Sequence, residues 1–169
     1  MSGDDLHTYE PRDLENMTAL DAVDSVTADI LDHRITVDGT GLFNVMRHVD
    51  LLCHLTTRMV ADAEYQLAPN ITGLPPAKAL CASAAHLGRA VAHYTQALVP
   101  LITLTTTTQD TLQQSIDALD HHSSLRIHLD NARRSLAAAR TELDVQHPLA
   151  TASTSAPASR HAPAARRRA

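Results

Sequence analysis

A heptad-like spacing of apolar residues between positions 77 and 104 constrains the fold of this chain more than any other feature. The apolar side chains follow one another at alternating steps of four and three residues: Leu80, Ala84, Leu87, Val91, Tyr94, Leu98 and Leu101. This spacing produces one continuous apolar stripe on an α-helix, with the period of helices that pack side by side in coiled coils and bundles. Pro100 cannot donate a hydrogen bond to the carbonyl of Gln96, so it should bend or end this helix.

Two segments before this stripe also predict helices. Residues 14–33 would form a helix with one apolar face and one face rich in aspartate, and Asp13 is a suitable N-cap. Residues 42–67 follow Thr40, another suitable N-cap. The broad apolar face of this second segment comprises Leu42, Val45, Met46, Val49, Leu52, Cys53, Met59, Val60, Ala63 and Leu67.

Four large residues of the second segment lie outside its broad apolar face: Phe43, Leu51, Leu55 and Tyr65. The first three form a second apolar strip. A second apolar strip on one helix indicates that the helix is central or meets a partner. We therefore predict an interaction surface at these residues, unless the helix at 14–33 covers them.

A last helix is predicted over 111–146, where Asp110 and Gln113 resemble a capping box. Its apolar residues are Leu112, Ile116, Leu119, Leu125, Leu129, Ala132, Leu136, Ala139 and Leu143. The step from Leu119 to Leu125 is six residues instead of seven, which shifts the stripe or forces a kink. The segment is therefore one helix or two.

These patterns predict an all-α fold: an antiparallel bundle of four helices, or five if the last one is interrupted. Aromatic residues make up only 2% of the chain, so the core must be aliphatic. We assign residues 13–146 to the bundle, residues 1–12 to a flexible acidic N-terminus, and residues 147–169 to a disordered tail of Ala, Ser, Pro and Arg, which lacks the apolar residues to fold. Cys53 and Cys81 are expected to be buried free thiols.

Charge is unevenly distributed along the chain. Residues 1–33 carry nine acidic side chains and one basic one, whereas residues 147–169 carry four arginines and no acid. Arg126, Arg133 and Arg140 form a basic stripe that could contact phosphates, the aspartates of residues 14–33, or solvent. The net charge of −9 over residues 1–146 makes nucleic-acid binding an unfavourable interpretation.

The sequence contains few features that indicate where in the cell the protein is located or what kind of organism it comes from. The first residues lack the apolar region of a secretory signal, and no run of 18 apolar residues could span a membrane. The expected location is the cytoplasm. Arginine greatly outnumbers lysine and alanine is abundant, which indicates a G+C-rich bacterium.

Eleven histidines raise the possibility of a metal site. The candidates are His48, His86, His93 and His122, since helices could bring them together in a bundle. The spacing alone favours histidines that are exposed or flank the apolar stripes, because no H-x-x-x-H or Glu-x-x-His pair is present. The i, i+4 pair of Asp29 and His33 is expected to be an exposed helix pair.

No catalytic residue is predicted, since the sequence has no nucleophile elbow and no phosphate-binding glycine loop. No cofactor is expected either. We therefore expect a non-enzymatic helical interaction protein, an accessory or regulatory factor that acts through helix–helix contacts with a protein partner or a second copy. The alternative is a metal- or small-ligand-binding bundle that uses its histidines.

Overall fold

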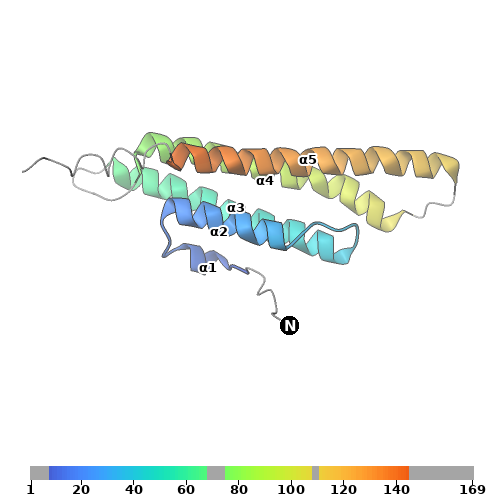
Figure 1. The fold of residues 1–169 in the computed structure, drawn as a ribbon, viewed down its shortest axis with the longest axis horizontal. Helices are drawn as coiled ribbons and strands as arrows, with labels where there is room; N and C mark the ends of the chain where they lie inside the picture. Colours follow the sequence, from blue (N-terminus) through green and yellow to red (C-terminus); the bar gives the residue numbers. More distant parts are fainter. Residues whose placement is uncertain (1–7, 68–74, 108–110, 145–169) are drawn as a thin grey trace, which may run out of the picture.

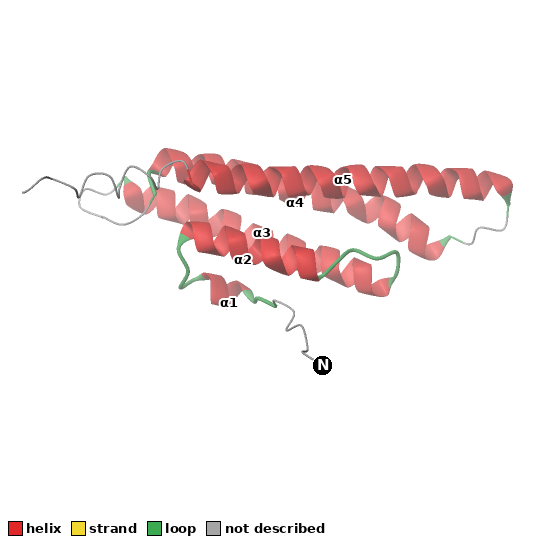
Figure 2. Ribbon diagram, in the orientation of Figure 1, coloured by secondary structure: helices red, strands yellow, loops and turns green. Residues whose placement is uncertain are grey.

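The computed structural model describes residues 8–67, 75–107 and 111–144, and within these ranges the chain forms α-helices and no β-strand. The helices are α1 (Pro11–Leu14), α2 (Ala19–Asp32), α3 (Gly39–Gln66), α4 (Ala77–Thr106) and α5 (Leu112–Asp144), shown in Figure 1. Figure 2 shows the loops that join them. The predicted all-α helical bundle is confirmed; the predicted C-terminal tail and residues 1–7 lie outside the described residues.

The four long helices form a ring. α3 packs along α4, α4 packs along α5, and the shorter α2 lies against both α3 and α5, opposite α4. The single turn of α1 packs on α3. The C-terminal end of α4 and the N-terminal end of α5 project beyond α2 and α3, as Figure 1 shows.

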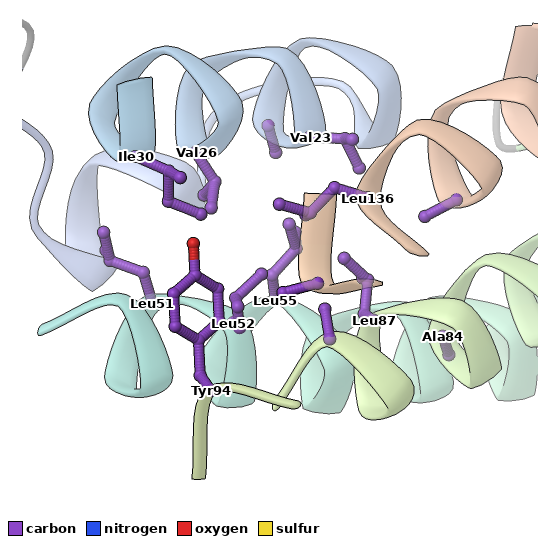
Figure 3. Packing of buried hydrophobic residues seen from close by; sticks show 14 of the residues in the cluster. Val23, Val26, Ile30, Leu51, Leu52, Leu55, Ala84, Leu87, Tyr94 and Leu136 are labelled. Carbon is purple, nitrogen blue, oxygen red and sulfur yellow. The ribbon is translucent and has the colours of Figure 1, made fainter. Parts of the chain in front are cut away.

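The centre of the ring is aliphatic, as the composition predicts. Figure 3 shows Val23, Val26 and Ile30 of α2 packing above the leucines of α3, with Leu136 of α5 beside them. The apolar stripe of α4 supplies the opposite side of this core, and Leu87 is fully buried. Burial raises the pKa of Tyr94, the one aromatic ring in the described core, to about 12.

Two of the predicted N-caps are wrong. Thr18, not Asp13, caps α2, because Asp13 instead accepts a hydrogen bond from the backbone N–H of Glu10 at 2.7 Å and closes the separate turn of α1. Asp38, not Thr40, caps α3 by accepting a hydrogen bond from the N–H of Gly41 at 2.8 Å. These two caps move the helix starts to Ala19 and Gly39.

Gly41 is required where α3 begins. A Cβ atom at this position would lie 1.7 Å from the carbonyl oxygen of Thr36. The hydroxyl of Thr36 also donates to Asp38 at 2.7 Å, so the connector folds back tightly onto the first turn of α3. The hydrogen bonds from Gly41 and then Thr36 lower the pKa of Asp38.

The prediction that Pro100 could end its helix is wrong, because α4 continues to Thr106. Proline removes one backbone hydrogen bond, but Pro100 is itself buried, and so are Leu101 and Leu104 after it. Apolar burial beyond the proline therefore outweighs the missing bond.

α5 is a single helix that passes through His121–Ser124 without a break. It starts with a reciprocal cap one residue later than predicted: the N–H of Thr111 donates to Gln114 and the N–H of Gln114 donates to Thr111, at 2.9 and 3.2 Å. Asp110 of the predicted capping box lies outside the described residues. The six-residue step shifts the apolar residues around the helix, so that Leu112 and Leu119 are exposed whereas Leu136 and Leu143 are buried.

Candidate interaction surface

The predicted strip of Phe43, Leu51 and Leu55 is not a surface. Leu51 and Leu55 are only 1% and 0% exposed, while Phe43 is 66% exposed. Our prediction for the two leucines is wrong because α1 and α2 cover this side of α3. Phe43 alone remains accessible.

Hydrogen bonds identify the covered side of α3. Arg47 binds the carboxylate of Asp29 in α2 at 2.6 Å, and Arg58 donates to the carbonyl oxygens of Leu14 and Met17. Asn44 donates to the carbonyl oxygen of Arg34 at 2.9 Å. These three side chains therefore face the N-terminal segments.

The face of α3 that points away from the core carries a different row of residues. Every member of this row is exposed: Phe43, Met46, Asp50, Cys53, Thr57, Val60, Glu64 and Leu67. The steps alternate between three and four residues, which keeps the row on one face along the helix. We call it the α3 outer row. Its four large apolar members, Phe43, Met46, Val60 and Leu67, expose between 54% and 78% of their surface.

α4 has a matching row on its own outer side. All of its members are exposed and none is charged: Cys81, Ala85, Gly88, Ala92, Thr95, Val99, Ile102 and Thr106. The steps again alternate between four and three. We call it the α4 outer row. Most of its side chains are small, in contrast to the large apolar side chains of the α3 outer row.

The two outer rows lie on either side of the contact between α3 and α4. On α3, the side opposite Asn44 and Arg58 carries Leu42 and Val49, which are half-buried against the core, and α4 is the neighbour left to cover them. On α4, His86 and His93 mark the side that faces α5, so Val91 and Leu98 on the other side face α3. Each outer row lies beside this shared seam.

The α3–α4 outer face therefore consists of a half-buried aliphatic floor and two exposed rows. Sequence reasoning missed it because Met46, Cys53 and Val60 are apolar and were assigned to the core face. The signal that distinguishes the two faces is the polar content of each row: the outer row includes Asp50, Thr57 and Glu64, whereas the inner row of Val45, His48, Leu52, Leu55 and Met59 has only His48. The two cysteines, predicted to be buried, are exposed on this face.

α5 adds a smaller exposed apolar strip on the projecting end of the hairpin. Leu112, Ile116, Leu119 and Ile127 share one side of the helix and are all exposed. The strip faces away from the buried row of Leu125, Ala132 and Leu136. Between the ends of α4 and α5 lies a cavity of about 120 Å³ lined by Thr103, Leu104, Asp117, Ala118 and His121 among others. It is smaller than the roughly 300 Å³ of typical ligand pockets.

The four candidate histidines do not come together. His48 is fully buried in α3 with its ring 5.3 Å from that of Tyr94, and His86 lies 4.0 Å from the carboxylate of Glu142. His93 lies 6.2 Å from the ring of His128, and His122 is exposed. Among the described residues, no group of three or more His, Cys, Asp or Glu side chains is arranged to hold a metal ion.

His48 is chemically unusual because neither of its ring nitrogens has a hydrogen-bond partner. Burial disfavours the charged imidazolium and lowers the pKa of His48 to about 4, although the carboxylate of Asp29 acts in the opposite direction. The ring is therefore neutral near pH 7 and behaves as a core side chain. His48 is not among the residues that line the cavity between the ends of α4 and α5.

Asp29 also departs from its predicted role. It is fully buried, so the expected exposed pair with His33 is wrong. Arg47 binds both of its carboxylate oxygens, at 3.2 and 2.6 Å, and the N–H of Tyr9 donates to it at 2.8 Å. Arg47 in turn donates to the carbonyl oxygen of Tyr9. This network fastens the segment before α1 to α2 and α3, which is a structural function.

The basic stripe of α5 has one partner that was predicted and one that was not. Arg140 binds Asp24 of α2 at 2.7 Å, as expected if the stripe faces the aspartates of residues 14–33. Arg126 and Arg133 instead lie near Asp130 of their own helix. No described helix is long and apolar enough to cross a membrane.

Comparisons with protein-family models, with curated proteins and with solved structures find no match to this chain. The function therefore has to be inferred from the surface that the chain itself presents.

Proposed function

We propose that this chain is a non-enzymatic helical interaction protein, an accessory or regulatory factor that acts through helix–helix contacts on the α3–α4 outer face. The observation that carries the proposal is the near absence of charge on this face. Asp50 and Glu64 are the only charged members of two exposed rows that run along most of α3 and α4. Extended apolar surfaces with a polar rim are typical of protein contact sites.

The shape of the face supports a helical partner. Two exposed rows on neighbouring helices, with half-buried aliphatic side chains between them, provide a face against which an amphipathic helix can lay its apolar side. Lysine and arginine are absent from both rows, which argues against nucleic acid, since phosphate binding depends on basic side chains. We retain the sequence-based proposal of a bacterial, cytoplasmic protein.

A substitution at Gly88 tests this function. Position 88 lies in the middle of the α4 outer row, and a Cβ atom there meets no other atom within 4 Å. Gly88→Gln should therefore leave the fold intact while placing a bulky polar group in the path of a docking helix. Ala137→Gln makes a similar change at an exposed position of α5, outside this face, and is the matched control.

The measurement compares the proteins retained by wild type and by both variants from an extract of the source cells. We expect wild type and Ala137→Gln to retain the same partners, further copies of this chain included, and Gly88→Gln to lose them. Retention of one identical set by all three proteins, or of nothing by any of them, would show that this face is not an interaction surface.

The alternative, a metal- or small-ligand-binding bundle, has one observation in its favour. His93 and His128 come from facing helices, and the Nδ1 atom of each is buried without a partner. Two imidazoles supply only half of the four ligands of a typical zinc site. Titration of purified protein with zinc, followed by elemental analysis after dialysis, tests this alternative; one retained equivalent that is lost in His93→Ala would favour it over helix docking.

A further inference from the structure

The two outer rows differ in the size of their side chains. The α3 outer row presents large ones, among them Met46, Val60 and Leu67, whereas the middle of the α4 outer row is Ala85, Gly88 and Ala92. Small residues allow a neighbouring helix to approach closely. The middle of the α4 outer row is therefore a place where a second helix can pack against α4.

The charges beside this face and its size argue for one occupant. We propose that a second copy of this chain binds there, in a two-fold dimer that places α3 of each protomer on α4 of the other. The proposal rests on the interaction function proposed above and names its partner. A two-fold axis that runs parallel to the helices makes the contact between α3 and the partner's α4 twice.

The charges on this face and beside it are consistent with the same arrangement. Asp50 and Glu64 are members of the α3 outer row, and exposed Lys78 and Arg89 lie beside the α4 outer row. Placing α3 on the partner's α4 brings the acidic side chains of one copy near the basic side chains of the other. Placing α3 on the partner's α3 would bring acidic side chains together, which is unfavourable.

The positions of these charged residues along the helix axes also match. The contact between His48 and Tyr94 sets the register of the antiparallel α3 and α4. Glu64 is sixteen residues after His48, and Lys78 is sixteen residues before Tyr94, so the two are level. By the same reasoning Asp50 is level with Ala92, which is one helical turn from Arg89. An axis parallel to the helices preserves these levels in the dimer.

The size of the face suits a stable dimer. The α3 outer row spans residues 43–67 and the α4 outer row spans 81–106, so each is about 36 Å long at 1.5 Å per residue. Two helices side by side are about 20 Å wide, which gives roughly 700 Å² per protomer. Standard protein–protein interfaces bury about 800 Å² per partner.

Sedimentation of the purified full-length chain tests the dimer. At about 50 µM, well above a micromolar Kd, wild type and Ala137→Gln should sediment as dimers and Gly88→Gln as a monomer. Circular dichroism and Tm must show that Gly88→Gln is folded, which is expected because it replaces an exposed helical glycine. A monomeric wild type, or a dimer that Gly88→Gln leaves unchanged, overturns the proposal.

A charge exchange tests the arrangement of the two copies. Glu64→Lys and Lys78→Glu should each weaken dimerisation by about tenfold, and the double variant should restore it. Failure of the double variant to restore the dimer overturns the contact between α3 and the partner's α4. If wild type is monomeric but Gly88→Gln still loses a partner from the cell extract, the proposed dimer is wrong and the proposed interaction function holds. If wild type is monomeric and Gly88→Gln loses no partner from the extract, the dimer and the interaction function are both wrong.

Discussion

The two halves of α5 carry similar apolar residues but use them differently. In the C-terminal half, residues 128–144, Ala132, Leu136 and Leu143 are buried in the core. In the N-terminal half, residues 112–127, Leu112 is 79% exposed and Leu119 is 68% exposed. The helix is continuous, so its own backbone does not cause the difference.

The six-residue step turns Leu112 and Leu119 away from the buried side of α5, and the two halves also have different neighbours. The C-terminal half has α2 and α4 beside it, and Arg140 binds Asp24 of α2 there. The N-terminal half extends past α2 and α3, so α4 is its only long neighbour in Figure 1. An apolar stripe in a sequence thus predicts a helix face that can be covered, but it does not identify what covers it.

The largest expected effect is a core truncation in the C-terminal half. Leu136→Ala should cost about 2–5 kcal/mol of the free energy of unfolding, because it leaves a cavity among packed side chains. The same change at Leu119 should cost less than about 0.5 kcal/mol, since this side chain is mainly in water. Urea denaturation of both variants measures the contrast; equal losses would mean that the N-terminal half is also covered.

Acid should lower the free energy of unfolding through the core on which the C-terminal half of α5 packs. The pKa of His48 is about 4 in the folded chain, whereas a histidine exposed to water has a pKa of 6.5, so the unfolded chain binds more protons between these limits. Stability should therefore fall as pH decreases from about 6.5 towards 4, by about 1.4 kcal/mol per pH unit from this group. Asp29, His33 and Arg47 are the charged and titratable groups that act on His48.

The contribution of His48 is isolated by substitution. His48→Phe should remove the part of this pH dependence that His48 causes, which is roughly 3 kcal/mol of unfolding free energy between pH 6.5 and 4. His122→Gln, an exposed change in the N-terminal half, should leave the profile as it is in wild type. Denaturant titrations at pH 7, 5.5 and 4.5 make the comparison, and parallel profiles for wild type and His48→Phe would contradict it.

The smallest expected effect concerns surface charge. Arg140→Ala in the C-terminal half removes an exposed ion pair with Asp24, so Tm should decrease slightly at low salt and by less at high salt. Arg126→Ala in the N-terminal half removes only a distant pair with Asp130 in the same helix and should change Tm even less. Calorimetry at two salt concentrations checks the order; a larger effect from Arg126→Ala would reverse it.

The sequence was sufficient to predict the class of fold and the central helix. The stripe from Leu80 to Leu101 is buried almost throughout, with Val91 and Leu98 half-buried. The ends of helices were harder to predict, because Asp13, Thr18, Asp38 and Thr40 all have side chains that can cap. Their choice depends on tertiary contacts, such as the close approach of Thr36 to Gly41.

The candidate surface was harder to predict than the fold. α3 has apolar residues on several sides, and apolar character alone does not tell Leu51, which α2 covers, from Val60, which nothing covers among the described residues. The position of α2 depends on the buried contact between Arg47 and Asp29, which joins residues 18 positions apart. A pattern confined to one helix carries no information about such a contact.

The projecting end of the α4–α5 hairpin gives the proposed dimer two different ends. An axis parallel to the helices points both hairpins in the same direction, so their tips form a two-pronged fork. The exposed strips that contain Leu112 and Leu119 would then occur as a pair at this end. Among the described residues, the opposite end, where α3 finishes and α4 begins, has no such prongs. Anything that distinguishes the two ends would therefore meet the dimer in one orientation only.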